Sequence, residues 1–203
     1  MFNKQTVMKK TAFLLFLILL GCNNSNYESL SPEKVDTERL LKKINPNKAY
    51  DYWEVNFCLS ITPKTIFHKG DKKLKNRYNY TPVYGGFFQG CQPVSCSYTV
   101  AYLENAKWNY VYNERELASF INKIDNPEEA FLIAKIHDFN IDPYNPKGNG
   151  YLKTKNGYDL KVMKYINCPE SKESFIVSID SLGQLKKIES QGFYLKTKNC
   201  IVY

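Results

Sequence analysis

The chain has 203 residues, 24% of them charged, and carries a formal net charge of +8 at pH 7. This excess is modest and spread along the sequence, so it does not indicate a nucleic-acid partner. The sequence contains no phosphate-binding loop, no Ser-His-Asp order and no metal-binding motif, so we expect neither cofactor nor metal. The length suits one domain of ordinary size better than two.

The first 21 residues predict an export signal. Lys9 and Lys10 precede an unbroken apolar run over residues 12–20. A membrane-spanning helix needs about 20 apolar residues, so this run is too short to cross a bilayer. A basic start, a short apolar core and a small residue at the break are typical of a removable signal peptide. An ordinary secretory signal or a signal anchor is the alternative interpretation.

The sequence LLGC at residues 19–22 resembles the lipobox of bacterial lipoproteins. In that family the cysteine is acylated, with palmitate-type chains, and the peptide is cut before it. The resemblance therefore implies that Cys22 is the first mature residue and binds the chain to membrane lipid. Several acyl chains anchor a protein stably because each buried methylene contributes about 0.8 kcal/mol. Asn23 in place of Asp favours the outer membrane by the family's usual sorting preference.

Residues 22–47 are predicted to form a tether and a short helix, and residues 48–203 the folded domain. The tether begins with the polar sequence NNSNYES at residues 23–29. Ser31 is a good helix cap and Pro32 suits a first turn, so we expect a helix from there through Ile44. Removing residues 1–21 also removes three lysines and no acid, which leaves a formal charge of +5.

Apolar and polar residues alternate over residues 52–62, which predicts a half-buried strand. The buried side would carry Trp53, Val55, Phe57, Leu59 and Ile61, and the solvated side Glu54, Asn56, Cys58 and Ser60. A basic cluster follows, consisting of Lys72, Lys73, Lys75 and Arg77. We interpret it as a solvated loop, with anionic lipid headgroups or acidic glycans as the partners that such a charge attracts.

Strands and helices are also predicted in the rest of the chain. Two aromatic and β-branched runs, residues 98–103 and 107–112, are joined by ENAK and predict a hairpin. Asn113 with Glu116, and Asn126 with Pro127, are typical starts of helices. The expected apolar stripes of these helices are Leu117, Phe120, Ile121 and Ile124, and then Leu132, Ile133, Ile136 and Phe139.

The chain from residue 151 onward alternates again and predicts further strands. The hexapeptide YLKTKN occurs at residues 151–156 and 194–199, and we interpret both copies as lysine-rich edge strands. Residues 180–183, with the sequence DSLG, predict a turn between strands. The sum is an α+β domain with an antiparallel sheet and two or three helices on one side.

Five cysteines remain once Cys22 is acylated, in a compartment that permits disulfide bonds. We predict disulfides between Cys91 and Cys96 and between Cys168 and Cys200, with Cys58 as the odd thiol, although five cysteines allow other pairings. Closing the longer loop would stabilise the chain by about 3 to 4 kcal/mol. Structural zinc sites use two close pairs of ligands, and the 91/96 pair has no such counterpart.

The sequences YGG at residues 84–86 and Cys96-Ser97 resemble the nucleophile region of NlpC-type cysteine peptidases. In that family an aromatic-Gly-Gly precedes Asp-Cys-Ser-Gly, and the cysteine begins a helix. The resemblance implies Cys96 as a nucleophile, which needs a histidine as its base. The chain offers His68 and His137, and His137 is the candidate, although it lies near the end of a predicted helix and the family's histidine lies on a strand. Ser95 and Tyr98 depart from the family pattern, and the residues after Cys96 have strand character.

The function that the sequence favours is a non-catalytic binding or structural module of the cell envelope, with an envelope protein or a glycan as its ligand. One alternative is the NlpC-type peptidase that uses Cys96 and His137. Another is a glycan-binding lipoprotein, because 16 Tyr and 2 Trp provide rings that stack on sugars when exposed, although the same residues also fill strands.

Mass spectrometry of the membrane-extracted protein, alkylated before and after reduction, tests the cysteine assignments. We expect an acylated Cys22 at the N-terminus, and Cys91 and Cys96 that are alkylated only after reduction. A Cys96 thiol that is alkylated rapidly at neutral pH without reduction would support the peptidase alternative instead.

Overall fold

The fold is that of a computed structural model, which describes residues 26–60, 62–91 and 93–201. The predicted signal peptide and Cys22 lie outside the described residues. Within the described part of the chain, no helix combines the length and apolar character needed to span a membrane.

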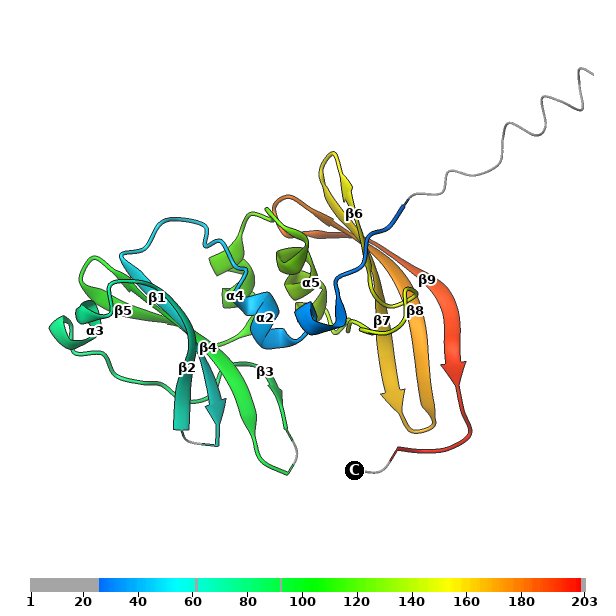
Figure 1. The fold of residues 1–203 in the computed structure, drawn as a ribbon, viewed down its shortest axis with the longest axis horizontal. Coiled ribbons are helices and arrows are strands. Elements are labelled where there is room, and N and C mark those ends of the chain that lie inside the picture. Colours follow the sequence, from blue (N-terminus) through cyan, green and yellow to red (C-terminus); the bar gives the residue numbers. More distant parts are fainter. Residues whose placement is uncertain (1–25, 61, 92, 202–203) are drawn as a thin grey trace, which may run out of the picture.

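Two antiparallel sheets enclose a layer of helices (Figure 1). The first sheet has the order β2-β1-β4-β3, with β5 also paired to β4, and the second has the order β6-β7-β8-β9. The first sheet consists of β1 (Tyr52–Leu59), β2 (Thr62–Gly70), β3 (Phe87–Gly90), β4 (Cys96–Glu104) and β5 (Lys107–Val111). The second consists of β6 (Gly150–Thr154), β7 (Gly157–Asn167), β8 (Glu170–Asp180) and β9 (Leu185–Lys196).

The helical layer consists of α2 (Thr37–Leu41), α4 (Glu114–Ile121) and α5 (Pro127–Ile136). A 3-10 turn, η2 (Pro32–Lys34), precedes α2, and α3 (Lys73–Arg77) lies on the first sheet away from this layer. The mixed α/β class and the antiparallel pairing agree with the sequence. The prediction of one sheet with helices on one side does not, because a second sheet covers the other side of the helices.

Side-chain caps begin α4 and α5 where the sequence predicts them. The Oδ1 atom of Asn113 accepts a hydrogen bond from Glu116 N at 2.9 Å. Asn126 and Glu129 form a capping box at the start of α5. The predicted hairpin is also present, since β4 and β5 pair from Val100 to Glu104.

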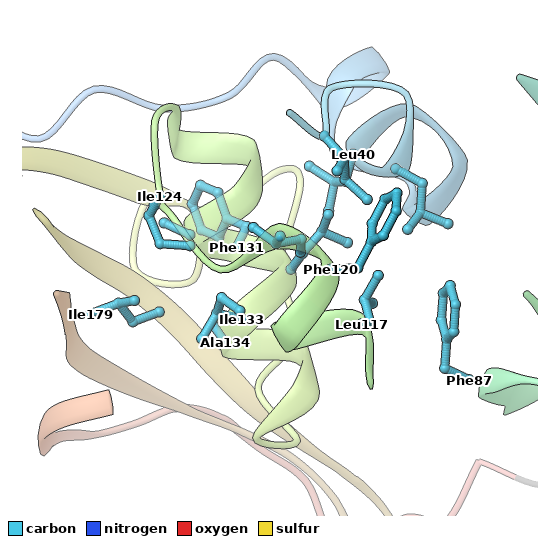
Figure 2. Close-up of a cluster of buried hydrophobic side chains, with 14 of the residues drawn as sticks. Leu40, Phe87, Leu117, Phe120, Ile124, Phe131, Ile133, Ala134 and Ile179 are labelled. Atoms are coloured by element: carbon cyan, nitrogen blue, oxygen red, sulfur yellow. The ribbon is translucent and has the colours of Figure 1, made fainter. Parts of the chain in front are cut away.

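The helix α5 is apolar on all sides because it packs between the two sheets. Its residues 130–134 are each at most 1% exposed, and a helix that is hydrophobic all round is a buried helix. Figure 2 shows Ile179 of β8 and Phe87 of β3 on opposite sides of the helical side chains. The single apolar stripe predicted for this helix is therefore too narrow a description, and the core is continuous from one sheet to the other.

The N-terminal segment belongs to this core. Glu28 pairs with Tyr151 through both backbone hydrogen bonds, and Leu40 and Leu41 are buried. The single helix predicted over residues 31–44 is divided in two, because Asp36 turns the chain and caps α2 by accepting a hydrogen bond from Arg39 N at 2.9 Å. From Glu28 onward, the segment predicted as a tether and helix is packed against the second sheet and the helices.

A buried carboxylate joins the connections at the start of the helical layer. The Glu129 side chain is fully buried and accepts hydrogen bonds from the backbone N–H groups of Asn45, Asp125 and Asn126 at 2.6, 2.8 and 3.3 Å. Burial raises the pKa of this carboxyl, and the three N–H donors oppose that rise. Glu129 thus fixes the α2–β1 connection to the α4–α5 connection.

The strand β1 is buried on both faces, which corrects the prediction of a half-buried strand. Glu54, Asn56 and Cys58 are at most 3% exposed, because the connection of residues 71–86 crosses that face of the sheet. The Nε1 atom of Trp108 donates to Tyr78 O at 3.0 Å and thereby holds this connection in place. We call the covered side the outer face of the first sheet.

Glu54 is the centre of a polar network on this outer face. Its carboxylate accepts hydrogen bonds from Lys75 Nζ at 2.6 Å, Tyr52 OH at 2.5 Å and Asn56 Nδ2 at 3.1 Å. Burial alone would raise the pKa of Glu54, but the hydrogen bonds from Lys75, Tyr52 and Tyr80 outweigh it and hold the pKa below its usual value. Lys75, predicted to lie in a solvated loop, is instead the counter-charge of a buried acid.

The second sheet confirms the interpretation of the repeated hexapeptide. Residues 151–156 and 194–199 begin in β6 and β9, which are the two edge strands of this sheet. Lysines at such positions oppose pairing with the strands of another molecule.

We predict that Lys75→Met lowers the free energy of unfolding by about 3 kcal/mol, because it leaves a buried carboxylate without its counter-charge. For a chain of this size the melting temperature would fall by about 6 to 12 °C. Lys73→Met, on the same short helix but exposed, is the matched control and should change stability by less than about 0.5 kcal/mol. Equal melting temperatures for the two variants would contradict the network.

The same network predicts a pH dependence. Because the pKa of Glu54 is lowered in the folded state, its contribution to stability is complete above the unfolded value of 4.5 and is lost as pH falls through the folded pKa. Glu54→Gln should therefore flatten this acid limb when unfolding by urea is measured between neutral pH and the acid range. An unchanged acid limb would contradict the assignment.

Candidate functional site: two clefts that meet at Lys135

The structure contains disulfide bonds. Cys91 is bonded to Cys96, with 5.4 Å between their Cα atoms, and Cys168 is bonded to Cys200, with 4.2 Å between theirs. Cys58 is a free and buried thiol whose pKa is raised by burial. A buried thiol that stays protonated is a poor nucleophile.

The residues of the peptidase alternative lie on separate elements. Cys96 begins the strand β4, is 5% exposed and is held in a disulfide. His137 is the exposed C-cap residue of α5. A thiolate at Cys96 would first require reduction of the bond to Cys91, and the expected start of a helix at the cysteine is replaced by a strand.

The aromatic residues of the glycan alternative are distributed over the molecule. Trp53 is buried in the core, and Trp108 is half-buried beneath the connection of residues 71–86. The exposed tyrosines Tyr84, Tyr112 and Tyr144 belong to three separate connections. Among the residues that the structure describes, no three His, Cys, Asp or Glu side chains are grouped so that they could hold a metal ion.

Two clefts open at the edge of the helical layer. The α2 cleft, of about 710 Å³, lies between residues 35–42, Tyr98 of β4 and the end of α5 through Ile141. The β3 cleft, of about 630 Å³, lies between Phe88 and Gln89, Glu114 and residues 135–140. Both volumes fall within the range of small-molecule and peptide sites. The two clefts share Lys135 and Asn140, so they meet at the end of α5.

Lys135 is the unusual side chain of these clefts. It lies in the last turn of α5, directly after the buried run of residues 130–134, and is half-buried. Its Nζ atom lies 5.1 Å from the centroid of the Phe88 ring, and no carboxylate of the described residues forms an ion pair with it. Burial lowers the pKa of the Lys135 ammonium.

The other charged groups of the α2 cleft have partners. Arg39 Nε lies 2.9 Å from an oxygen of Asp36, and Lys42 Nζ lies 3.9 Å from an oxygen of Glu38. These pairs are within α2 and lie at its surface. The cleft therefore contains matched pairs on its rim and one unmatched cation inside.

Other polar groups complete the lining of the two clefts. Burial, with the charges of Glu38 and Asp36 as smaller causes, raises the pKa of Tyr98 to about 12, so its phenol stays protonated at neutral pH. In the β3 cleft, Glu114 Oε1 accepts a hydrogen bond from Phe88 N at 2.9 Å. Asn140 is exposed and pairs with Met163 through its backbone alone, which leaves its amide available to a ligand.

Sequence reasoning missed this site. Lys135 is followed directly by the apolar Ile136, and a lysine in the last turn of a helix is ordinarily explained by the helix dipole. The only available signal was the unbroken apolar run before it, because a lysine at the end of a fully buried helix is not on a solvated face.

Comparison with protein-family models, with curated proteins and with solved structures gives no match for this chain. The site is therefore defined by its own geometry.

We predict that Lys135→Met does not destabilise the protein. The change removes a half-buried charge without an ion-pair partner and keeps an unbranched chain against Phe88, so the melting temperature should rise by about 1 to 4 °C. Lys42→Met, on the rim of the α2 cleft, is the control and, through loss of its exposed pair with Glu38, should lower it by no more than about 2 °C. A fall of several degrees for Lys135→Met would show that Lys135 supports the fold.

Proposed function

We propose that the protein is a lipid-anchored, non-catalytic binding protein of the cell envelope, and that its ligand occupies the α2 and β3 clefts. The observation that carries the binding role is the meeting of two clefts at one half-buried lysine without an ion-pair partner. The anchor is supported by the lipobox resemblance at Cys22, which also favours the outer membrane.

The position of the anchor limits how far from the membrane the protein can bind its ligand. Five residues lie between Cys22 and Glu28, where the chain joins β6, so six Cα-to-Cα steps connect the two. A fully extended chain of that length spans at most about 21 Å. In this proposal the folded body stays close to the membrane surface, and the ligand is a component found there.

A binding role is favoured over a catalytic one by the state of the reactive side chains. Cys96 is bonded to Cys91, and the Cys58 thiol is buried with a raised pKa. Neither is available as a thiolate nucleophile. Besides their acidic side chains, the clefts offer a cation, a neutral phenol and side-chain amides, which are groups that hold a ligand.

A glycan ligand has a different candidate surface. Two small pockets of about 210 and 250 Å³ share Lys48 and Tyr50, and Tyr102 and Trp53 contribute to one each. Tyr50 and Tyr102 are ring neighbours, with centroids 4.6 Å apart. We rank this surface second because the Tyr50 ring is already stacked on Phe120.

Thermal unfolding of the full-length protein in detergent tests the proposed site. Soluble peptide and glycan fractions from digested envelope are added to the wild type, to Asn140→Trp and to Asn76→Trp. Asn140→Trp fills the junction of the two clefts, and Asn76→Trp places the same ring on the exposed side of α3. At a ligand concentration 100 times Kd the stabilisation is about 2.7 kcal/mol, or roughly 5 to 10 °C here.

We expect one fraction to raise the melting temperature of the wild type and of Asn76→Trp but not of Asn140→Trp. An equal rise in all three proteins would move the binding site away from the clefts, and loss of that rise in Tyr102→Ala would assign it to the Tyr50 pockets. No rise with either fraction would contradict the proposed binding function.

A further inference from the structure

We propose that the ligand is an extended peptide-like chain with a single free carboxylate, and that this carboxylate binds the Lys135 ammonium where the two clefts meet. The inference rests on the proposed binding function and adds the chemical class of the ligand. It is carried by the charges, the shape and the neutral groups of the two clefts.

The charges favour a ligand with one negative group. Lys135 is the single cation of the clefts that lacks an acidic partner among the described residues, since Arg39 and Lys42 are paired within α2. Two acidic side chains without an ion-pair partner among the described residues, Glu114 and Asp138, line the β3 cleft beside it. These acids repel a multiply charged anion such as a phosphate ester, whereas a single carboxylate meets the one unmatched cation.

The shape favours an elongated ligand. The α2 cleft and the β3 cleft extend from Lys135 and Asn140 in two directions, toward α2 and toward β3. A compact ion would fill neither. A chain seated on Lys135 could enter both clefts, and its length would decide how much of each it fills.

The neutral groups suit a peptide backbone. The side-chain amides of Gln89 and Asn140 offer both donors and acceptors, which match the N–H and C=O groups of a peptide. The half-buried ring of Phe88 in the β3 cleft provides apolar contact for a ligand side chain, whereas Phe131 and Phe139 form the nearly buried floor of the α2 cleft.

The surroundings of Lys135 both stabilise and destabilise its ammonium charge. The C-terminal end of a helix favours a cation, and an aromatic face within about 6 Å adds a further attraction. Burial nevertheless lowers the pKa of the ammonium, so the free protein bears the cost of a partly desolvated charge. A bound carboxylate relieves that cost, which gives the ligand an affinity that a surface lysine would not provide.

Affinity selection with a peptide library tests the inference without assuming a peptide sequence. Immobilised full-length protein in detergent is offered N-acetylated pentapeptides of random sequence without acidic side chains, as C-terminal acids or as C-terminal amides. Retained peptides are counted by mass spectrometry for the wild type, Lys135→Gln, Lys135→Arg and, as a control outside both clefts, Lys73→Gln. Glycerol phosphate and glycerol are added as competitors in separate arms.

We expect the wild type and Lys73→Gln to retain at least tenfold more acid-form than amide-form peptide. Lys135→Gln should lose this preference, and Lys135→Arg should keep part of it because the charge is retained. The competitor arms test the carboxylate against a phosphate. If glycerol phosphate binds with higher affinity than the C-terminal acid peptides and displaces them, and glycerol at the same concentration does not, the carboxylate is overturned in favour of a phosphate.

Equal retention of the two forms, or an unchanged preference in Lys135→Gln, would also overturn the inference. If equal retention is abolished by Asn140→Trp, the clefts bind a peptide without using its carboxylate, and the proposed function stands. If neither form is retained above a column without protein, the peptide inference fails, and the envelope fractions decide separately whether the clefts bind another ligand.

Discussion

The burial of α5 between two sheets is the constraint on which the rest of the structure depends. A helix covered on both sides has no solvated face, and residues 130–134 in the middle of α5 are accordingly all apolar and buried. Its polar residues are confined to its two ends. Glu129 at the first turn is satisfied by three backbone N–H groups, whereas Lys135 at the last turn, among the residues that the structure describes, has the face of Phe88 and no ion-pair partner. The difference between the two ends separates a structural charge from a candidate functional one.

Polar networks cover the outer faces of both sheets in similar ways. Glu54 is held by Lys75 and Tyr52 on the first sheet, and Asp142 is held by Lys172 Nζ at 2.8 Å and Tyr194 OH at 2.9 Å on the second. In each case burial would raise the pKa of the acid, and the hydrogen bonds outweigh it and lower the pKa. Because a long connection is fixed over each outer face, the edge of the helical layer is left as the place where the two large clefts open.

The sequence predicts the features that depend on neighbouring residues. The caps of α4 and α5, the β4–β5 hairpin and the two lysine-rich edge strands each follow from a few adjacent side chains. The features that it missed depend on distant partners. Alternation in β1 indicates one buried face. The second is buried because the connection of residues 71–86 crosses it and its Lys75 supplies the charge that Glu54 needs. The role of Lys135 likewise depends on Phe88 and on the second sheet, neither of which is local to α5.

The ionisation of Lys135 is the measurement that tests this account most directly. Carbon-13 NMR of the lysine ε-carbons in the full-length protein in detergent, with the Lys135 signal assigned by its loss in Lys135→Arg, gives the pKa of this one ammonium. We expect a midpoint below the value of about 10.4 for a solvated lysine, and a shift to higher pH when the C-terminal acid peptides that the protein retains are added. An ordinary midpoint that the peptides do not move would contradict a desolvated cation that receives a carboxylate.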